Sequence, residues 1–167
     1  NSAYPHARPT SRRLTQGDAV LLDFGGVLDG YCVDLTRMAV IGQPDGQTAR
    51  LFDAVSEAHR AALAAVKPGV DGSAVDAAAR GVLENLGLGE AFLHATGHGL
   101  GLEVHEAPRV GRSTDAGNER LEAGMVLTVE PGAYLEGVGG VRLEDDVLVV
   151  AGGSELLTDA PRELLIV

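Results

Sequence analysis

The sequence has few of the features that mark secreted or membrane-spanning proteins. Cys32 is the only cysteine among the 167 residues, so no disulfide can form within the chain. No run of about 18 apolar residues and no signal-peptide pattern is present, so neither a transmembrane helix nor a secretory leader is predicted. We therefore expect a soluble protein of a reducing compartment, most simply the cytoplasm.

Basic residues are also scarce. The chain has 13 Lys and Arg against 24 Asp and Glu, which gives a net charge of −11. This balance argues against nucleic acid or an anionic membrane as a partner, whereas the excess of carboxylates permits metal binding. The hydrophobic content of 45% over this length predicts one globular domain spanning residues 1–167.

The beginning of the chain lacks a starting methionine and any clear element. NSAYPHARPTSRRLTQGD is polar, and Pro5 and Pro9 would break a helix. We expect that the chain is a fragment of a longer protein.

Two strand pairs and two helices are predicted after this segment. AVLLDFG and YCVDLTRMAVI flank a turn signal at Asp29-Gly30 and form a predicted hairpin. GMVLTVEPGAYL and GGVRLEDDVLVV form a second strand pair around a glycine-rich turn. Between the pairs, helical spacing predicts helices over about residues 48–66 and 73–86, the second with Ser73 and Asp76 in a capping box. The class is therefore α+β.

The two strand pairs resemble each other in where they place acids. Asp23 and Glu130 each follow, by six residues, a glycine that opens the first strand of its pair. Asp34 and Glu144 each lie inside the apolar run of the second strand. We interpret this pattern as a degenerate internal repeat.

The geometry of the first pair brings its two acids together. A hairpin with a two-residue turn at Asp29-Gly30 places Asp23 opposite Thr36, and Asp34 lies two residues from Thr36 on the same face. Two neighbouring carboxylates repel, so either one keeps a proton or a cation lies between them. The alternative is a solvent-facing acidic surface, and recurrence in the second pair favours the cation.

The segment HATGHGLGLEVHEAP holds three of the five histidines. It does not contain a helical H-E-x-x-H zinc motif, because Arg109 stands where the second histidine would be and Pro108 disfavours a helix. The glycines favour an extended segment, on which His94 and His98 share one side and His105 points to the other if the strand is regular. A lone histidine here would be structural, but the neighbouring strands carry four acids, which favours metal ligation.

Taken in order, DFGGVLDGYCVDLTR, TGHGLGLEVHEAP, TVEPGAY and VRLEDDV resemble the pita-bread metallopeptidases, which include Xaa-Pro dipeptidase (prolidase), aminopeptidase P and methionine aminopeptidase. The resemblance covers nearly the whole chain. It implies a pseudo-twofold repeat of strand pairs and helices around a curved antiparallel sheet. Members usually have helices and a strand before the NSAYPH segment, and Xaa-Pro enzymes commonly carry a further N-terminal domain. We expect that this catalytic domain is partial and lacks both.

The resemblance implies a dinuclear metal centre. Asp23 would chelate one ion, Asp34 and Glu144 would bridge the two ions, and His98 and Glu130 would complete the second. A ligand set of oxygens with one nitrogen suits manganese, and cobalt, zinc or iron would also fit.

The same resemblance implies the residues that act on the substrate. Glu130 would be the proton shuttle, and His94 and His105 would contact the substrate and stabilise the tetrahedral intermediate. His6 would lie at the pocket wall, and Arg142 would orient a ligand carboxylate within the substrate-binding region.

Arg142 also selects a branch of the family, because methionine aminopeptidases lack an arginine two residues before the last glutamate. We expect a metal-dependent exopeptidase that hydrolyses the bond before a proline at the second position of a peptide through a metal-bridged hydroxide, and that is a homodimer at full length. The choice between dipeptidase and aminopeptidase P stays open. The alternatives are a methionine aminopeptidase and a non-catalytic peptide- or protein-binding module on the same fold.

Overall fold

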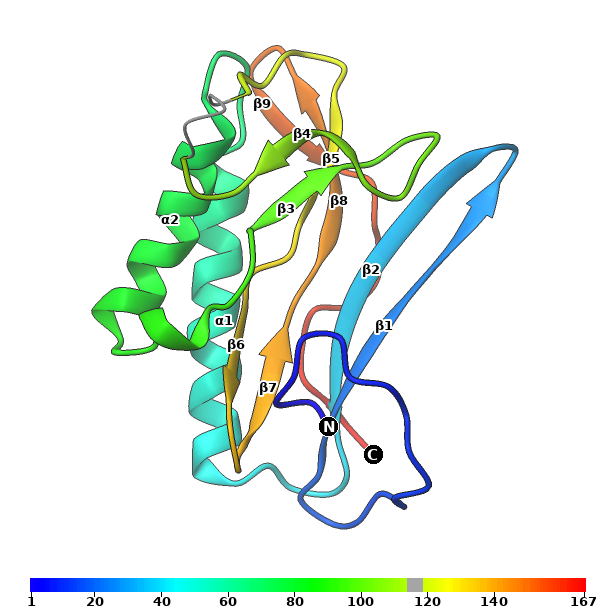
Figure 1. Ribbon diagram of the computed structural model, residues 1–167, viewed down its shortest axis with the longest axis vertical. Helices are drawn as coiled ribbons and strands as arrows, with labels where there is room; N and C mark the ends of the chain where they lie inside the picture. Colours follow the sequence, from blue (N-terminus) through cyan, green and yellow to red (C-terminus); the bar gives the residue numbers. More distant parts are fainter. Residues whose placement is uncertain (114–118) are drawn as a thin grey trace.

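The computed structural model describes residues 1–113 and 119–167, which form a mixed α+β structure with helices on one side of antiparallel strands (Figure 1). The predicted class is confirmed. In chain order the elements are β1 (Ala19–Leu28), β2 (Tyr31–Val40), α1 (Gly46–Ala65), α2 (Gly72–Asn85), a short 3-10 helix η1 (Gly89–Ala91), β3 (Gly97–Gly99), β4 (Glu106–Val110), β5 (Val126–Val129), β6 (Gly132–Leu135), β7 (Gly139–Arg142), β8 (Asp145–Val150), β9 (Gly153–Leu156) and β10 (Leu165–Ile166).

Strands β1 and β2 form the predicted hairpin. Asp29 and Gly30 both adopt positive φ, 50° and 88°, as a two-residue turn that follows the strand twist requires. The ladder pairs Asp23 with Thr36, so the predicted register is confirmed. β10 adds to the other edge of β2 in parallel, and the hairpin projects from the body of the molecule (Figure 1).

The second strand pair is interrupted at both of its predicted ligands. β5 pairs with β8 and β6 with β7, and the unchanged register places Glu130 opposite Glu144 in the gap. The backbone N–H of Glu130 donates to Thr96 O at 2.6 Å, and that of Glu144 donates to Thr36 O at 3.2 Å. The backbone N–H of each acid therefore bonds to another segment instead of to the paired strand. The prediction of two continuous strands was wrong at these positions.

The sheet around the histidine segment has the order β4-β3-β5-β8-β9. At two positions the backbone of its short strand β3 lies so close to the neighbouring strands that a side chain would not fit. A Cβ at Gly97 would lie 1.9 Å from Thr128 O, and one at Gly99 would lie 2.0 Å from Ala107 O. These two glycines therefore allow His98 to be held between β4 and β5.

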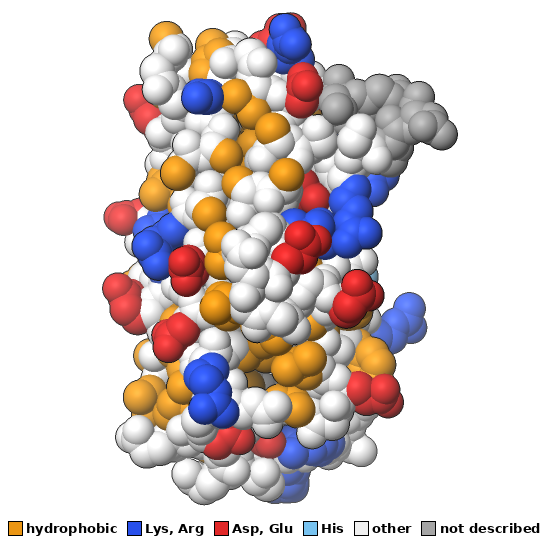
Figure 2. Space-filling model, turned by 90° about the vertical axis from the view of Figure 1, so that its left-hand side faces the viewer, with side chains coloured by type: hydrophobic (Ala, Val, Ile, Leu, Met, Phe, Trp, Pro, Cys, Tyr) orange, Lys and Arg blue, Asp and Glu red, His pale blue; other side chains and the backbone are white. Residues whose placement is uncertain are grey.

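Helices α1 and α2 pack on the strands and bury the main core. The core residues are Met38, Leu51, Phe52, Ala54, Val55, Ala58, Ala62, Val66, Val75, Ala79, Leu83, Ala91, Phe92, Val110, Leu121, Leu127, Val129, Ala133, Val141, Leu143, Val147 and Val149. On the face seen in Figure 2, acidic and basic side chains are interspersed among apolar ones. In the described ranges, every helix is too short or too polar to cross a membrane.

The start of α2 differs from the prediction. Asp71 is the N-cap residue and makes no side-chain capping bond, so the predicted Ser73–Asp76 capping box is wrong. The Asp76 carboxylate instead accepts from Arg80 one turn later and from the backbone and hydroxyl of Thr96. Asp76 therefore ties α2 to the segment that leads into β3.

Candidate metal centre and active site

Three predicted metal ligands converge from distant parts of the chain. One ligand atom each from Asp34 on β2, His98 on β3 and Glu144 between β7 and β8 lie within 4.8 Å of one another. Glu130 borders this cluster, with its Oε1 3.4 Å from His98 Nε2. The structure therefore brings four of the predicted ligands together, and their binding of metal stays a prediction.

Asp23, the fifth predicted ligand, reaches the cluster through Arg142. Its Oδ2 accepts a hydrogen bond from Arg142 Nη2, and Arg142 Nε lies 3.8 Å from Glu130 Oε2. The Asp23 side chain is 44% exposed, whereas the Arg142 side chain is 2% exposed. Arg142 therefore holds Asp23 beside the other four residues, and its role in orienting a ligand carboxylate stays a prediction.

The cluster concentrates negative charge in a buried place. Burial raises the pKa of Glu144 to about 9, and the charge of Glu130 adds to this effect. Burial likewise raises the pKa of Glu130 to about 8 against the opposing charge of Arg142. Burial, together with the charge of Asp23, also raises the pKa of Asp34. The two glutamates thus hold protons near neutral pH unless a cation compensates them, so the residues fit divalent metal ions.

The ring of His98 is oriented for ligation. Its Nδ1 lies 3.0 Å from Gly99 O, and because a carbonyl can only accept, Nδ1 carries the proton. Nε2 then presents its lone pair to the cluster. Burial lowers the pKa of His98, which keeps the imidazole in the neutral form that binds metal.

His94 has both ring nitrogens occupied. Nδ1 donates to Ala95 O at 2.8 Å, so Nε2 accepts from the hydroxyl of Tyr134 at 2.8 Å. The same hydroxyl accepts from Arg142 Nη1 at 3.0 Å. Burial lowers the pKa of His94 to about 4 and raises that of Tyr134 to about 12, so both groups are neutral near pH 7. A contact between His94 and substrate would require Tyr134 to release Nε2.

His105 lies beside the cluster and not on the opposite side. The segment before β4 bends instead of continuing as a strand, and a register shift follows His98. The ring centroids of His98 and His105 are therefore 4.2 Å apart. Opposite sides were expected only for a regular strand, and the bend and the register shift show that the segment is not one.

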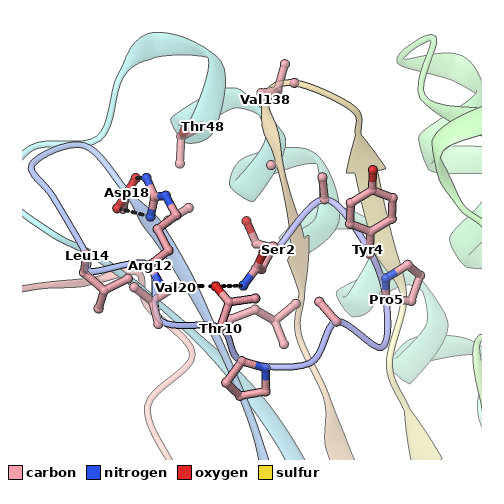
Figure 3. A pocket seen from close by; sticks show the side chains of 18 of the residues that line it. Ser2, Tyr4, Pro5, Thr10, Arg12, Leu14, Asp18, Val20, Thr48 and Val138 are labelled. Carbon is pink, nitrogen blue, oxygen red and sulfur yellow. Dashed lines mark hydrogen bonds and ion pairs between the residues drawn. The ribbon is translucent and has the colours of Figure 1, made fainter.

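His6 lines a pocket that leads to Asp23. The pocket has a volume of about 750 Å³ and lies between the N-terminal segment, β1 and the turn joining β6 to β7. Figure 3 shows Tyr4 and Pro5 on one side of it and the Arg12–Asp18 ion pair on the other. Pro5 O also accepts from Arg142 Nη1 at 3.1 Å, which anchors the N-terminal segment to the site.

Sequence reasoning missed three residues that support the ligands. Thr36 Oγ1 donates to Glu144 Oε2 at 2.6 Å, and Asp146 Oδ2 accepts from the backbone N–H of Asp34 at 3.2 Å. Tyr134 joins His94 to Arg142. The predicted register already placed Thr36 opposite Asp23, which was the one available signal for its role.

Comparison with known proteins gives a consistent result. Residues 1–151 match metallopeptidase family M24. The chain is 40% identical over 164 residues to the Xaa-Pro dipeptidase of Pyrococcus furiosus, covering 98% of this chain and 46% of that protein. The crystal structure of recombinant prolidase from Thermococcus sibiricus is similar with a TM-score of 0.94 and 45% identity, covering 100% of this chain and 45% of that one. The crystal structure of X-Pro aminopeptidase from Thermotoga maritima is similar with a TM-score of 0.93 and 40% identity, covering 99% of this chain and 46% of that one. The chain thus spans less than half the length of these relatives.

Proposed function

The chain belongs to metallopeptidase family M24 and has its pita-bread fold, and on this basis we propose that it acts as a metal-dependent exopeptidase on Xaa-Pro peptide bonds. The observation that carries the proposal is the convergence of Asp34, His98 and Glu144 within 4.8 Å. A non-catalytic binding module has no need for buried acids that repel one another around an oriented imidazole. The substrates would be Xaa-Pro dipeptides or peptides with proline in second position.

Two divalent ions would be held by Asp23, Asp34, His98, Glu130 and Glu144. We propose that Asp34 and Glu144 are shared by the two ions, because one carboxylate oxygen of each lies within 4.8 Å of the other and of a ring nitrogen of His98. Manganese suits the oxygen-rich donor set best. Such ions would polarise the scissile carbonyl and acidify water at the site.

Glu130 would move the proton. Its carboxyl lies between His98 Nε2 and Arg142 Nε, at 3.4 and 3.8 Å. A carboxylate within reach of water at the site can act first as a general base and then as a general acid. The proton would pass from water to the leaving nitrogen through this carboxyl.

The histidines would bind the peptide. His105 stands beside His98 and faces the same site, and His6 lines the pocket that reaches Asp23. His94 would contact the substrate after exchanging its bond with Tyr134. Arg142 would act by holding Asp23 and the N-terminal segment in place. We also propose that the full-length protein is a cytoplasmic homodimer.

The relatives leave two Xaa-Pro activities to distinguish, because a prolidase and an X-Pro aminopeptidase match with equal coverage. Arg142 disfavours methionine aminopeptidase. Its four hydrogen bonds, to Asp23, Thr36, Tyr134 and Pro5, also tie Arg142 into this site.

The test is hydrolysis of an Xaa-Pro dipeptide and of a tripeptide with proline in second position, each with Mn²⁺ and then with chelator. Metal-dependent release of proline from the dipeptide alone would identify a dipeptidase. Release of the first residue from the tripeptide would identify an aminopeptidase. If the protein binds Mn²⁺ but cleaves neither peptide, the proposed activity is wrong and a binding role takes its place.

A further inference from the structure

Asp145 is a buried acid that the proposed reaction does not use. It lies between Glu144 and Asp146, and successive residues of an extended segment point to opposite faces. Glu144 and Asp146 contact Thr36 and Asp34 on the side of the metal centre. Asp145 therefore points away from the centre, into the body of the protein, where its side chain has no solvent exposure.

Four side chains from three other segments surround Asp145. Its Oδ1 accepts from Arg37 Nη2 at 2.7 Å and from Thr158 Oγ1 at 2.5 Å. Its Oδ2 accepts from Arg162 Nε at 2.5 Å, and His59 Nε2 on α1 lies 3.3 Å away. A buried carboxylate with these partners joins β8 to β2, to α1 and to the segment after β9.

Arg37 uses all of its N–H donors in the same cluster. Its acceptors are Asp145 Oδ1 and the backbone carbonyls of Thr36, Glu144, Ala160 and Pro161. Five N–H groups thus meet five acceptors, so the planar guanidinium has one orientation here. Two of these acceptors belong to Glu144, a proposed bridging ligand, and to Thr36, whose hydroxyl donates to the Glu144 carboxylate.

The cluster therefore holds Glu144 in position from the side opposite the metal centre. Arg37 fixes the Glu144 carbonyl at 2.5 Å, and Thr36 fixes the Glu144 carboxylate at 2.6 Å. Asp34 lies two residues from Thr36 on β2, and its N–H is held by Asp146. A shift of Arg37 or Asp145 would move both proposed bridging carboxylates relative to each other.

We propose that Arg37 and Asp145 are positioning residues of the metal centre, and that residues 158–162 set its affinity for divalent cations through them. This inference rests on the proposed function, because it requires a metal centre at Asp34 and Glu144. The partners supplied by residues 158–162 are Thr158, Arg162 and the carbonyls of Ala160 and Pro161.

The experiment uses variants that weaken the cluster without touching a proposed ligand. Thr158→Val combined with Arg162→Met removes two donors to Asp145, and Asp145→Asn changes the acceptor itself. Arg120→Met is the matched surface control, since Arg120 pairs with Asp71 at the start of α2. Val75→Ala, buried in α2, is the control for lost stability. Affinity for Mn²⁺ is measured by calorimetry, ligand geometry by the visible spectrum of bound Co²⁺, and the melting temperature in chelator.

Outer hydrogen-bond partners of metal ligands typically change affinity by roughly 10- to 100-fold. We expect the double variant to bind Mn²⁺ about 10-fold more weakly and Asp145→Asn more weakly still, both with an altered Co²⁺ spectrum. Val75→Ala should lower the melting temperature and change neither metal property, and Arg120→Met should behave as wild type.

Two results would overturn the inference. If the double variant melts at lower temperature but keeps wild-type Mn²⁺ affinity and Co²⁺ spectrum, the cluster only stabilises the fold. If the wild-type protein itself binds no Mn²⁺, the proposed function falls and the inference with it. Should Asp145→Asn not fold, the double variant still decides, because Thr158 and Arg162 are partly exposed.

Discussion

The β1–β2 hairpin and the interrupted strand pair β5–β8 with β6–β7 both deliver carboxylates to one site, but from opposite environments. The hairpin projects from the body (Figure 1), and the apolar side chains of its outer part, near the turn, remain exposed. These are Leu22, Phe24, Val27, Leu28, Tyr31 and Val33. The interrupted pair lies among the core residues beneath α1, and Glu144 is 2% exposed.

The two pairs also differ in how they bring acids together. In the hairpin, Asp34 is diagonal to Asp23, with Thr36 opposite Asp23. In the interrupted pair, the register sets Glu130 directly opposite Glu144. Burial raises the pKa of both glutamates, and at Glu144 the charge of the facing Glu130 adds to this effect. The buried pair therefore accounts for most of the electrostatic repulsion that bound metal would relieve. The exposed hairpin adds the remaining carboxylates of the site.

Removing an acid of the buried pair should have the largest effect on metal content and activity. We expect Glu144→Ala to lose both metal ions, because the bridging ligand disappears, and to lose more activity than the roughly 10- to 100-fold typical of an outer partner. Metal content and Xaa-Pro hydrolysis are the measurements. Asp53→Ala, which removes an exposed acid on α1, should resemble wild type. Two ions retained at full occupancy in Glu144→Ala would refute the bridging assignment.

Removing an acid of the exposed hairpin should have a smaller effect on metal content. Asp23→Asn should weaken mainly one ion, so that the metal content falls from two towards one per chain. Asp29→Asn makes the same chemical change at the turn of the same hairpin and should be neutral, because Asn tolerates the positive φ found there. Loss of both ions in Asp23→Asn would show that the exposed and buried ligands are not separable.

The same contrast explains which features were predictable from sequence. The Asp29-Gly30 turn and the Asp23–Thr36 pairing follow from local turn chemistry, which holds without tertiary contacts. The hydrogen bonds of the Glu130 and Glu144 backbones to Thr96 and Thr36 join segments distant in sequence, so no local pattern could reveal these partners. The position of the His105 ring likewise depends on a bend and a register shift. The proposed ligands stand out by order and residue type, but their support by Tyr134 and Arg37 depends on tertiary packing.

The buried pair predicts how stability depends on pH. The pKa values of Glu144 and Glu130 in the folded state, about 9 and about 8, exceed the ordinary value of 4.5. The chelated protein should therefore lose stability as pH rises from about 4.5 towards 9, since the unfolded chain releases these protons first. Measurement between pH 7 and 9 avoids His94, whose lowered pKa acts below neutrality.

Mn²⁺ should remove this loss, so the difference in melting temperature between the loaded and chelated proteins should widen with pH. Each kcal/mol corresponds to about 2–4 °C for a chain of this size. Glu144→Ala, chelated, should show a weaker dependence on pH than wild type. A melting temperature of the chelated wild type that stays level or rises from pH 7 to 9 would contradict the charge argument.

The smallest effect should come from the residue that joins the two regions without ligating metal. Tyr134 on β6 donates to His94 and accepts from Arg142, which holds Asp23 of the hairpin. Tyr134→Phe removes both hydrogen bonds, each of about 0.5–1.5 kcal/mol, and should lower kcat/KM by about 100-fold or less, with metal content unchanged. Tyr31→Phe on the exposed hairpin is the matched control and should leave kcat/KM unchanged. If the two variants behave alike, His94 and Arg142 keep their positions without Tyr134, and the exposed and buried regions are coupled through the metal ligands alone.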